Sequence, residues 1–92
     1  MRMIWKYELV VKYPGHQAIV RMPRGAHVFC AREQGPEICV WADVDTDAPA
    51  EPRTFEVFGT GWEFPPGERR YVGTAMLDGG RFVFHVYERT GG

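Results

Sequence analysis

The chain has 92 residues, of which 45% are hydrophobic, 14% aromatic and 25% charged, and its net charge is −1. This composition excludes a disordered chain, and the length allows one small hydrophobic core. No apolar run approaches the ~20 residues of a membrane-spanning helix, and the balanced charge gives no general support for nucleic-acid binding. We therefore expect a single β domain over residues 1–92, with frayed ends at residues 1–3 and 89–92.

The first predicted strand covers residues 4–11, in which apolar and polar residues alternate. A Pro14-Gly15 pair is typical of a tight turn, and Pro23 ends the strand that follows it. The predicted hairpin places apolar residues opposite apolar ones and opposite charges together: Leu9 faces Val20, Tyr7 faces Met22 and Glu8 faces Arg21. The segment's internal Lys and Glu argue against a signal peptide, so we expect no export by that route.

A third and a fourth strand are predicted at residues 26–33 and 38–44, joined by a Gln34-Gly35 loop. This loop aligns four pairs across the two strands: Phe29 with Val40, Cys30 with Cys39, Ala31 with Ile38 and Arg32 with Glu37. The neighbouring cysteines allow a disulfide, but a reducing compartment favours free, largely buried thiols. Two cysteines without further ligands at suitable spacing do not make a zinc site.

Residues 45–52 read as an exposed connection, and residues 54–58 resume strand character. The aspartates at 43, 45 and 47 alternate as in a calcium loop, but Ala48 stands where such a loop needs Gly. A loop of about a dozen residues follows, with three Gly and two Pro, and loops of this length are often functional. It supplies most of the candidate ligand-binding or partner-binding residues: Arg53, Trp62, Phe64, Arg69 and Arg70.

The strongest hairpin signal lies at residues 71–88, where two β-forming runs flank Asp78-Gly79-Gly80. With Gly79-Gly80 as the loop, small residues lie opposite large ones: Gly73 faces Val86, Ala75 faces Phe84 and Leu77 faces Phe82. The other face is too apolar for a fully hydrated surface, which suggests self-association through a patch: Val72, Met76, Val83, His85 and Tyr87. Alternatively, the second sheet or the 60–70 loop covers this face and leaves a monomer.

Seven short strands without a helix predict an all-β fold, a small antiparallel β-sandwich or a flattened barrel. The three histidines have no close spacing, and no pair of carboxylates or thiol with a base indicates catalysis. We expect no enzyme activity, no catalytic residue, no metal and no cofactor.

Seven spaced motifs are distributed over nearly the whole chain: IWKY at 4–7, MPRGA at 22–26, WADVD at 41–45, EPRTF at 51–55, FGTG at 58–61, YVGT at 71–74 and FVFHVYE at 82–88. Together they resemble an uncharacterised family of short bacteriophage and prophage proteins. The resemblance implies a phage- or prophage-encoded protein in the host cytoplasm or the virion, and it implies no activity.

Two functional hypotheses follow from the sequence. The first is a non-enzymatic interaction module that binds a protein partner or itself as a homodimer, as a virion accessory or a modulator of a host factor. The second is a protein that binds a small nucleotide-like ligand in the 60–70 loop. Membrane and nucleic-acid partners are not expected.

Overall fold

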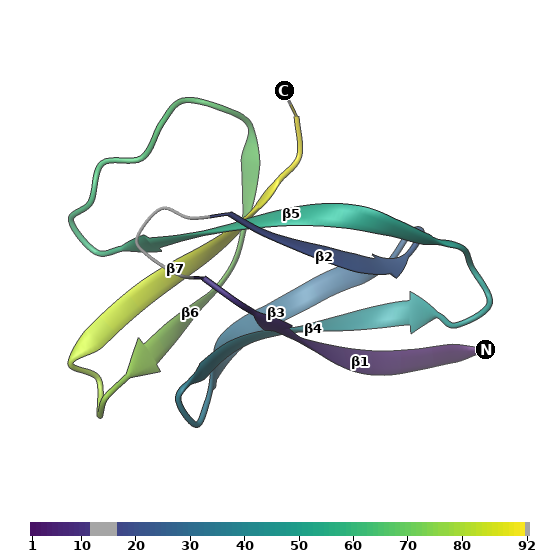
Figure 1. The fold of residues 1–92 in the computed structure, drawn as a ribbon, viewed down its shortest axis with the longest axis horizontal. Coiled ribbons are helices and arrows are strands. Elements are labelled where there is room, and N and C mark those ends of the chain that lie inside the picture. The colour runs from purple at the N-terminus through teal and green to yellow at the C-terminus, as the bar shows by residue number, and fades with distance from the viewer. Residues whose placement is uncertain (12–16, 92) are drawn as a thin grey trace.

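The computed structural model describes residues 1–11 and 17–91, which form seven β-strands in two antiparallel sheets (Figure 1). The strands follow one another along the chain: β1 (Arg2–Leu9), β2 (Gln17–Pro23), β3 (His27–Gln34), β4 (Glu37–Asp45), β5 (Ala50–Gly59), β6 (Arg69–Leu77) and β7 (Phe82–Arg89). Sheet A has the strand order β1-β4-β3, and sheet B has the order β2-β5-β7-β6. This architecture confirms the expected all-β sandwich, and the described strands do not close into a barrel.

The core lies between the two sheets and follows from the alternation of side chains along each strand. Along β4, for example, Ile38, Val40, Ala42 and Val44 are buried and point toward sheet B. Fully burying one such aliphatic side chain contributes ~1.5–3 kcal/mol. The largest fully buried apolar side chains come from both sheets: Met22, Val28, Val40, Val44, Phe55 and Val86.

The predicted hairpin between the first two strands is wrong. β1 pairs with β4, so Leu9 lies opposite Ile38, while β2 pairs with β5, so Val20 lies opposite Arg53. The two strands therefore belong to different sheets. The Pro14-Gly15 turn itself lies outside the described residues.

The hairpin of β3 and β4 exists, but its register differs from the predicted one by two residues. Gln34 pairs with Glu37, so Gly35-Pro36 forms the loop, and Gly35 has a φ of 61° that suits the first central position of a primed turn. Cys30 consequently lies opposite Trp41, and Cys39 lies opposite Arg32. The cysteines are not a directly facing pair.

The hairpin of β6 and β7 has the predicted register, with Leu77 opposite Phe82 and Ala75 opposite Phe84. The register shifts between Tyr71 and Gly73, which leaves Val72 as the extra residue of a β-bulge. Val72 therefore turns into the core instead of joining the opposite face.

The fifth strand begins earlier than predicted, at Ala50 instead of Thr54. Its first half pairs only with β2, and its pairing with β7 begins at Phe55. Pro52 is tolerated because one side of β5 has no ladder to interrupt at that point.

Strands β3 and β6, the edge strands on one side of the two sheets, approach each other closely. A Cβ atom added to Gly73 would lie 2.2 Å from the carbonyl oxygen of Ala31. The backbone N–H of Met76 donates to the Glu33 carboxylate at 2.7 Å, and Arg70 donates to the carbonyl oxygen of Val28 at 3.0 Å. On this side each sheet covers the edge of the other.

Candidate functional site

The 60–68 loop folds back over the outer face of sheet B. The Phe64 ring packs on Phe58 and Tyr87, with centroid distances of 4.8 and 5.7 Å. Phe64 is still 46% exposed, so the contact covers the sheet with one side of the ring only. The loop therefore covers part of the apolar face for which the sequence predicts self-association.

The buried side chain of Arg69 binds the 60–68 loop to sheet B. Its side chain is 5% exposed and donates from Nε to Glu56 Oε1 at 2.9 Å and from Nη1 to the carbonyl oxygen of Pro65 at 2.8 Å. The guanidinium group lies over the rings of Phe58 and Phe64, and Arg89 adds a second positive charge 3.7 Å from Glu56 Oε1. The charge of this predicted binding residue is already compensated by a buried carboxylate.

Arg53 and Arg70 lie between the sheets and share the buried carboxylate of Glu88. Arg53 binds it through Nε and Nη2, and Arg70 donates from Nη2 to Oε1 at 3.2 Å. Arg53 also donates to the carbonyl oxygen of Ala26 at 3.0 Å. The hydrogen bonds with Glu88 raise the pKa of Arg53 above its ordinary value. Together these arginines tie β5, β6 and β7 of sheet B to the strand β3 side of sheet A.

Trp62 lies apart from these arginines. Its indole ring packs directly on Gly59, where a Cβ atom would lie 2.5 Å from Cε2, and its centroid is 5.9 Å from that of Phe84. Gly59 is thus required by the close approach of the ring. Trp62 and the three predicted arginines do not converge on one site.

The predicted self-association patch is also divided. Met76 is exposed and Val83 half-buried, but Val72 belongs to the core and Tyr87 lies against Phe64. His85 bridges two hydroxyl groups, with Nε2 2.7 Å from Thr60 Oγ1 and Nδ1 3.2 Å from Thr74 Oγ1.

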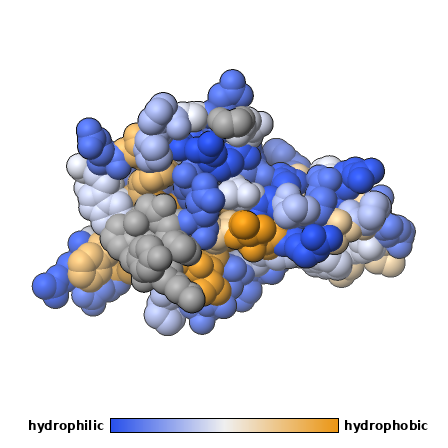
Figure 2. Space-filling view, turned by 45° about the horizontal axis from the view of Figure 1, so that its top comes forward, coloured by the Kyte–Doolittle hydropathy of each residue, from blue (hydrophilic) through white to orange (hydrophobic). Residues whose placement is uncertain are grey.

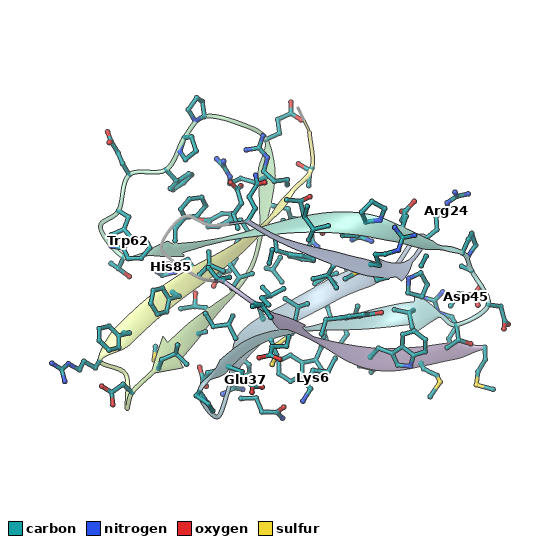
Figure 3. The ribbon with its side chains drawn as sticks, in the orientation of Figure 1. Lys6, Arg24, Glu37, Asp45, Trp62 and His85 are labelled. Carbon is teal, nitrogen blue, oxygen red and sulfur yellow. The ribbon has the colours of Figure 1, made fainter. Side chains whose placement is uncertain are left out.

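A cleft lies at one end of the sandwich, between the tips of the two sheets. Its volume is about 540 Å³. Sheet A contributes the end of β1 and the β3–β4 turn, sheet B contributes the β6–β7 hairpin, and the 60–68 loop contributes Trp62. Figure 3 labels two of the lining residues, Glu37 and Trp62. Ten of the twelve lining residues are apolar, and Glu8 and Glu37 supply the two carboxylates: Glu8, Leu9, Val10, Val11, Pro36, Glu37, Ile38, Val57, Trp62, Leu77, Phe82 and Phe84.

Of the cleft-lining residues, sequence reasoning selected only Trp62 as a site residue. The sequence feature that could have indicated the cleft is the apolar character of both strands of the last hairpin near its turn. Leu77 lies on the first of these strands, and Phe82 and Phe84 lie on the second. Their neighbours in space, Leu9 and Ile38, come from distant strands, so the cleft depends on how the sheets stack.

Other reactive side chains do not gather into a site in the described part of the chain. Cys30 and Cys39 are free thiols, and burial raises the pKa of Cys39, which disfavours the reactive thiolate. No group of three or more potential metal ligands occurs among residues 1–11 and 17–91.

Comparison with known proteins identifies the family. A family model described as a domain of unknown function, DUF7352, matches residues 1–92. The chain belongs to the DUF7352 family. No curated protein and no solved structure matches it. Within the described residues of this DUF7352 domain, no helix is long and apolar enough to cross a membrane.

Proposed function

We propose that this DUF7352 domain is a non-catalytic binding module that holds an apolar segment of a protein partner in the cleft between the sheet tips. The observation that carries the proposal is the cleft itself, with an apolar lining drawn from both sheets and a volume of about 540 Å³. Binding sites are typically concave and apolar, with a few polar groups that fix orientation.

The polar groups of the cleft indicate the charge of the partner. Glu8 and Glu37 are both exposed, and neither forms an ion pair with another described residue. Carboxylates beside an apolar cleft favour a segment that carries Lys or Arg next to its apolar side chains. Phe82 and Trp62 are both partly exposed at the cleft and can contact such a segment.

Figure 2 shows hydrophobic residues in separate patches among hydrophilic ones on the face that it presents. The nucleotide-binding alternative gains no support from the arginines, because Arg69 is paired with Glu56, and Arg53 and Arg70 are paired with Glu88.

The resemblance of the seven motifs to phage and prophage proteins bears on the setting of this function. It favours an origin in a phage or prophage, and we propose a virion component or a host factor as the partner. On this proposal the protein acts in the host cytoplasm or in the virion.

Selection of short peptides from a displayed random library tests the proposal. We expect the selected peptides to combine apolar residues with Lys or Arg and to shift the NMR signals of Trp62, Leu77 and Phe82. The substitution Phe82→Glu should weaken binding at least ~10-fold, which corresponds to ~1.4 kcal/mol.

The matched control is Met76→Glu, which introduces the same charge at an equally exposed apolar residue of the neighbouring strand, outside the cleft. It should leave peptide affinity unchanged. Failure to select any peptide, equal effects of the two substitutions, or a small molecule retained in the cleft in native mass spectra would each overturn the proposal of a protein segment as ligand.

A further inference from the structure

The two sides of the sandwich differ in how their edge strands are protected. On one side β3 and β6 cover each other at Ala31 and Gly73. On the other side β1 borders sheet A, and its only strand partner among the described strands is β4 (Figure 1). An unprotected edge strand offers a row of backbone donors and acceptors to another chain.

The backbone groups available at this edge can be assigned. Thr46 N–H donates to the carbonyl oxygen of Met1, so Met1 belongs to a hydrogen-bonded pair with β4. The pattern alternates along an antiparallel ladder, and the odd-numbered residues of β1 therefore bond to β4. The N–H and C=O groups of the even-numbered residues face outward: Arg2, Ile4, Lys6 and Glu8.

The side chains of this strand are more apolar than an exposed edge normally is. Ile4 is 64% exposed, Met3 46% and Trp5 36%, and the three are consecutive. Native edge strands usually avoid such surface or cover it. Lys6 is on the outer face of the same strand and projects away from sheet B (Figure 3).

The sequence of β1 is complementary to itself in one antiparallel register. A two-fold axis perpendicular to the sheet keeps the cores of both copies on the same side of the joined sheet. Residues that face each other across the two copies of β1 must therefore be both even-numbered or both odd-numbered. Centring the axis on Trp5 places Arg2 opposite the second copy's Glu8 at both ends of the pairing. The inner pairs are then Met3 with Tyr7, Ile4 with Lys6, and Trp5 with Trp5.

The neighbouring registers of the same parity bring like charges together. Centring on Ile4 places Arg2 opposite Lys6, and centring on Lys6 places two Lys6 side chains opposite each other. Like charges directly opposite each other destabilise a strand pair. Glu8 forms no ion pair with any other described residue. Arg2 pairs with Asp43 of its own chain at 2.8 Å, but this pair is exposed, and the guanidinium group has further N–H donors for Glu8 of a second copy.

We propose that two copies of this chain associate through β1, antiparallel and centred on Trp5, so that their two A sheets form one continuous sheet. The charge complementarity of Arg2 and Glu8 selects a second copy as the occupant of this edge. The pairing covers residues 2–8 and leaves most of the cleft lining outside the interface. Because edge pairing buries less surface than a standard interface, we expect a dissociation constant in the micromolar range.

Light scattering over a range of concentrations up to about 500 μM tests the association. The mass should rise from near 10.5 kDa toward twice that value. A mass that stays near 10.5 kDa at the highest concentration would overturn the proposal.

Charge reversal tests the register. Arg2→Glu and Glu8→Arg should each raise the dissociation constant at least ~10-fold, because each places like charges at both ends of the pairing. A mixture of the two variants should form heterodimers, since every end pair is again one Arg and one Glu. Arg32→Glu, whose side chain on β3 is about as exposed as that of Arg2, is the control and should leave the dimer unchanged.

Circular dichroism of each variant verifies that the monomer is folded. If Arg2→Glu and Glu8→Arg remain dimers when separate, or if their mixture fails to associate, the two chains do not meet in this register.

Discussion

Glu88 shows how much one buried carboxylate contributes to this small domain. It is 5% exposed and lies between Arg53 and Arg70. Removing one partner of a buried ion pair leaves the other charges uncompensated, at a cost of ~3–5 kcal/mol. Since domains of this size have stabilities of ~5–15 kcal/mol, this loss is a large fraction of the total.

We predict that Glu88→Gln lowers the free energy of unfolding by about 3 kcal/mol, because Arg53 and Arg70 lose their shared counter-charge. Urea unfolding at pH 7 measures the loss. The exposed pair of Arg24 and Glu51 provides the control, and Glu51→Gln should change the stability by less than ~1 kcal/mol. Equal effects of the two substitutions would show that Glu88 does not act through its buried charge.

Glu33 makes the contact between the sheets sensitive to pH. Its carboxylate accepts the backbone N–H of Met76, and this hydrogen bond is the main cause that holds the pKa of Glu33 below its ordinary value. A carboxyl group whose pKa is lower in the folded state stabilises the fold above its unfolded pKa, and the contribution is lost as the pH falls through the folded pKa.

We predict that Glu33→Gln is less stable than the wild type at pH 7 and that the difference shrinks as the pH falls below 4.5, the ordinary value for Glu. The protonated Glu33 then resembles the amide that replaces it. Urea midpoints across this pH range provide the measurement. Glu63→Gln, in the exposed 60–68 loop, is the control and should be as stable as the wild type at pH 7. A difference for Glu33→Gln that persists unchanged in acid would contradict the prediction.

At the scale of the strands, Gly73 determines how closely β3 and β6 approach. A side chain at this position would meet the backbone of Ala31, which cannot move aside as a flexible side chain can. We predict that Gly73→Ala lowers the free energy of unfolding by about 3 kcal/mol, the upper range for overpacking.

The matched control is Gly79→Ala in the β6–β7 turn, where the added methyl group meets open space but the φ of 66° disfavours alanine. It should cost only about 1 kcal/mol. Urea unfolding compares the two variants. If Gly73→Ala cost no more than Gly79→Ala, the two strands would not be in the close contact described.

The two hairpins show what local sequence predicts and what it does not. The β6–β7 turn was predicted correctly from Asp78-Gly79-Gly80, because few residues other than glycine and aspartate tolerate the positive φ values found there. The β3–β4 loop was predicted one residue too early, at Gln34-Gly35. In the structure Gly35 occupies the first central position of the turn, not the second. Val72 was assigned to the wrong face, since its bulge depends on contacts that a strict alternation does not encode.

At the scale of the molecule, the number and class of the strands followed from their alternation and turns, but the stacking of the sheets did not. β1 and β2 have apolar faces that match each other equally well as neighbours in a hairpin or as strands of opposite layers. The cleft was missed for the same reason, because Leu9 and Phe82 line a common cleft only once the two sheets are stacked. Trp62 could be predicted as a site residue because an aromatic residue in a long loop is recognised from the sequence without knowing how the sheets stack.

The pairing of β1 with β4 also affects the order in which the structure forms. Strand β1 finds no partner in the strand that follows it, because its ladder is completed only when residues 37–45 have also left the ribosome. Until then, a segment that complements itself remains unpaired in every growing chain. Chains dominated by such distant pairings fold slowly, on the order of milliseconds to seconds. If two copies pair through β1 as proposed, neighbouring nascent chains on one messenger have time to join before either has completed its own sheet.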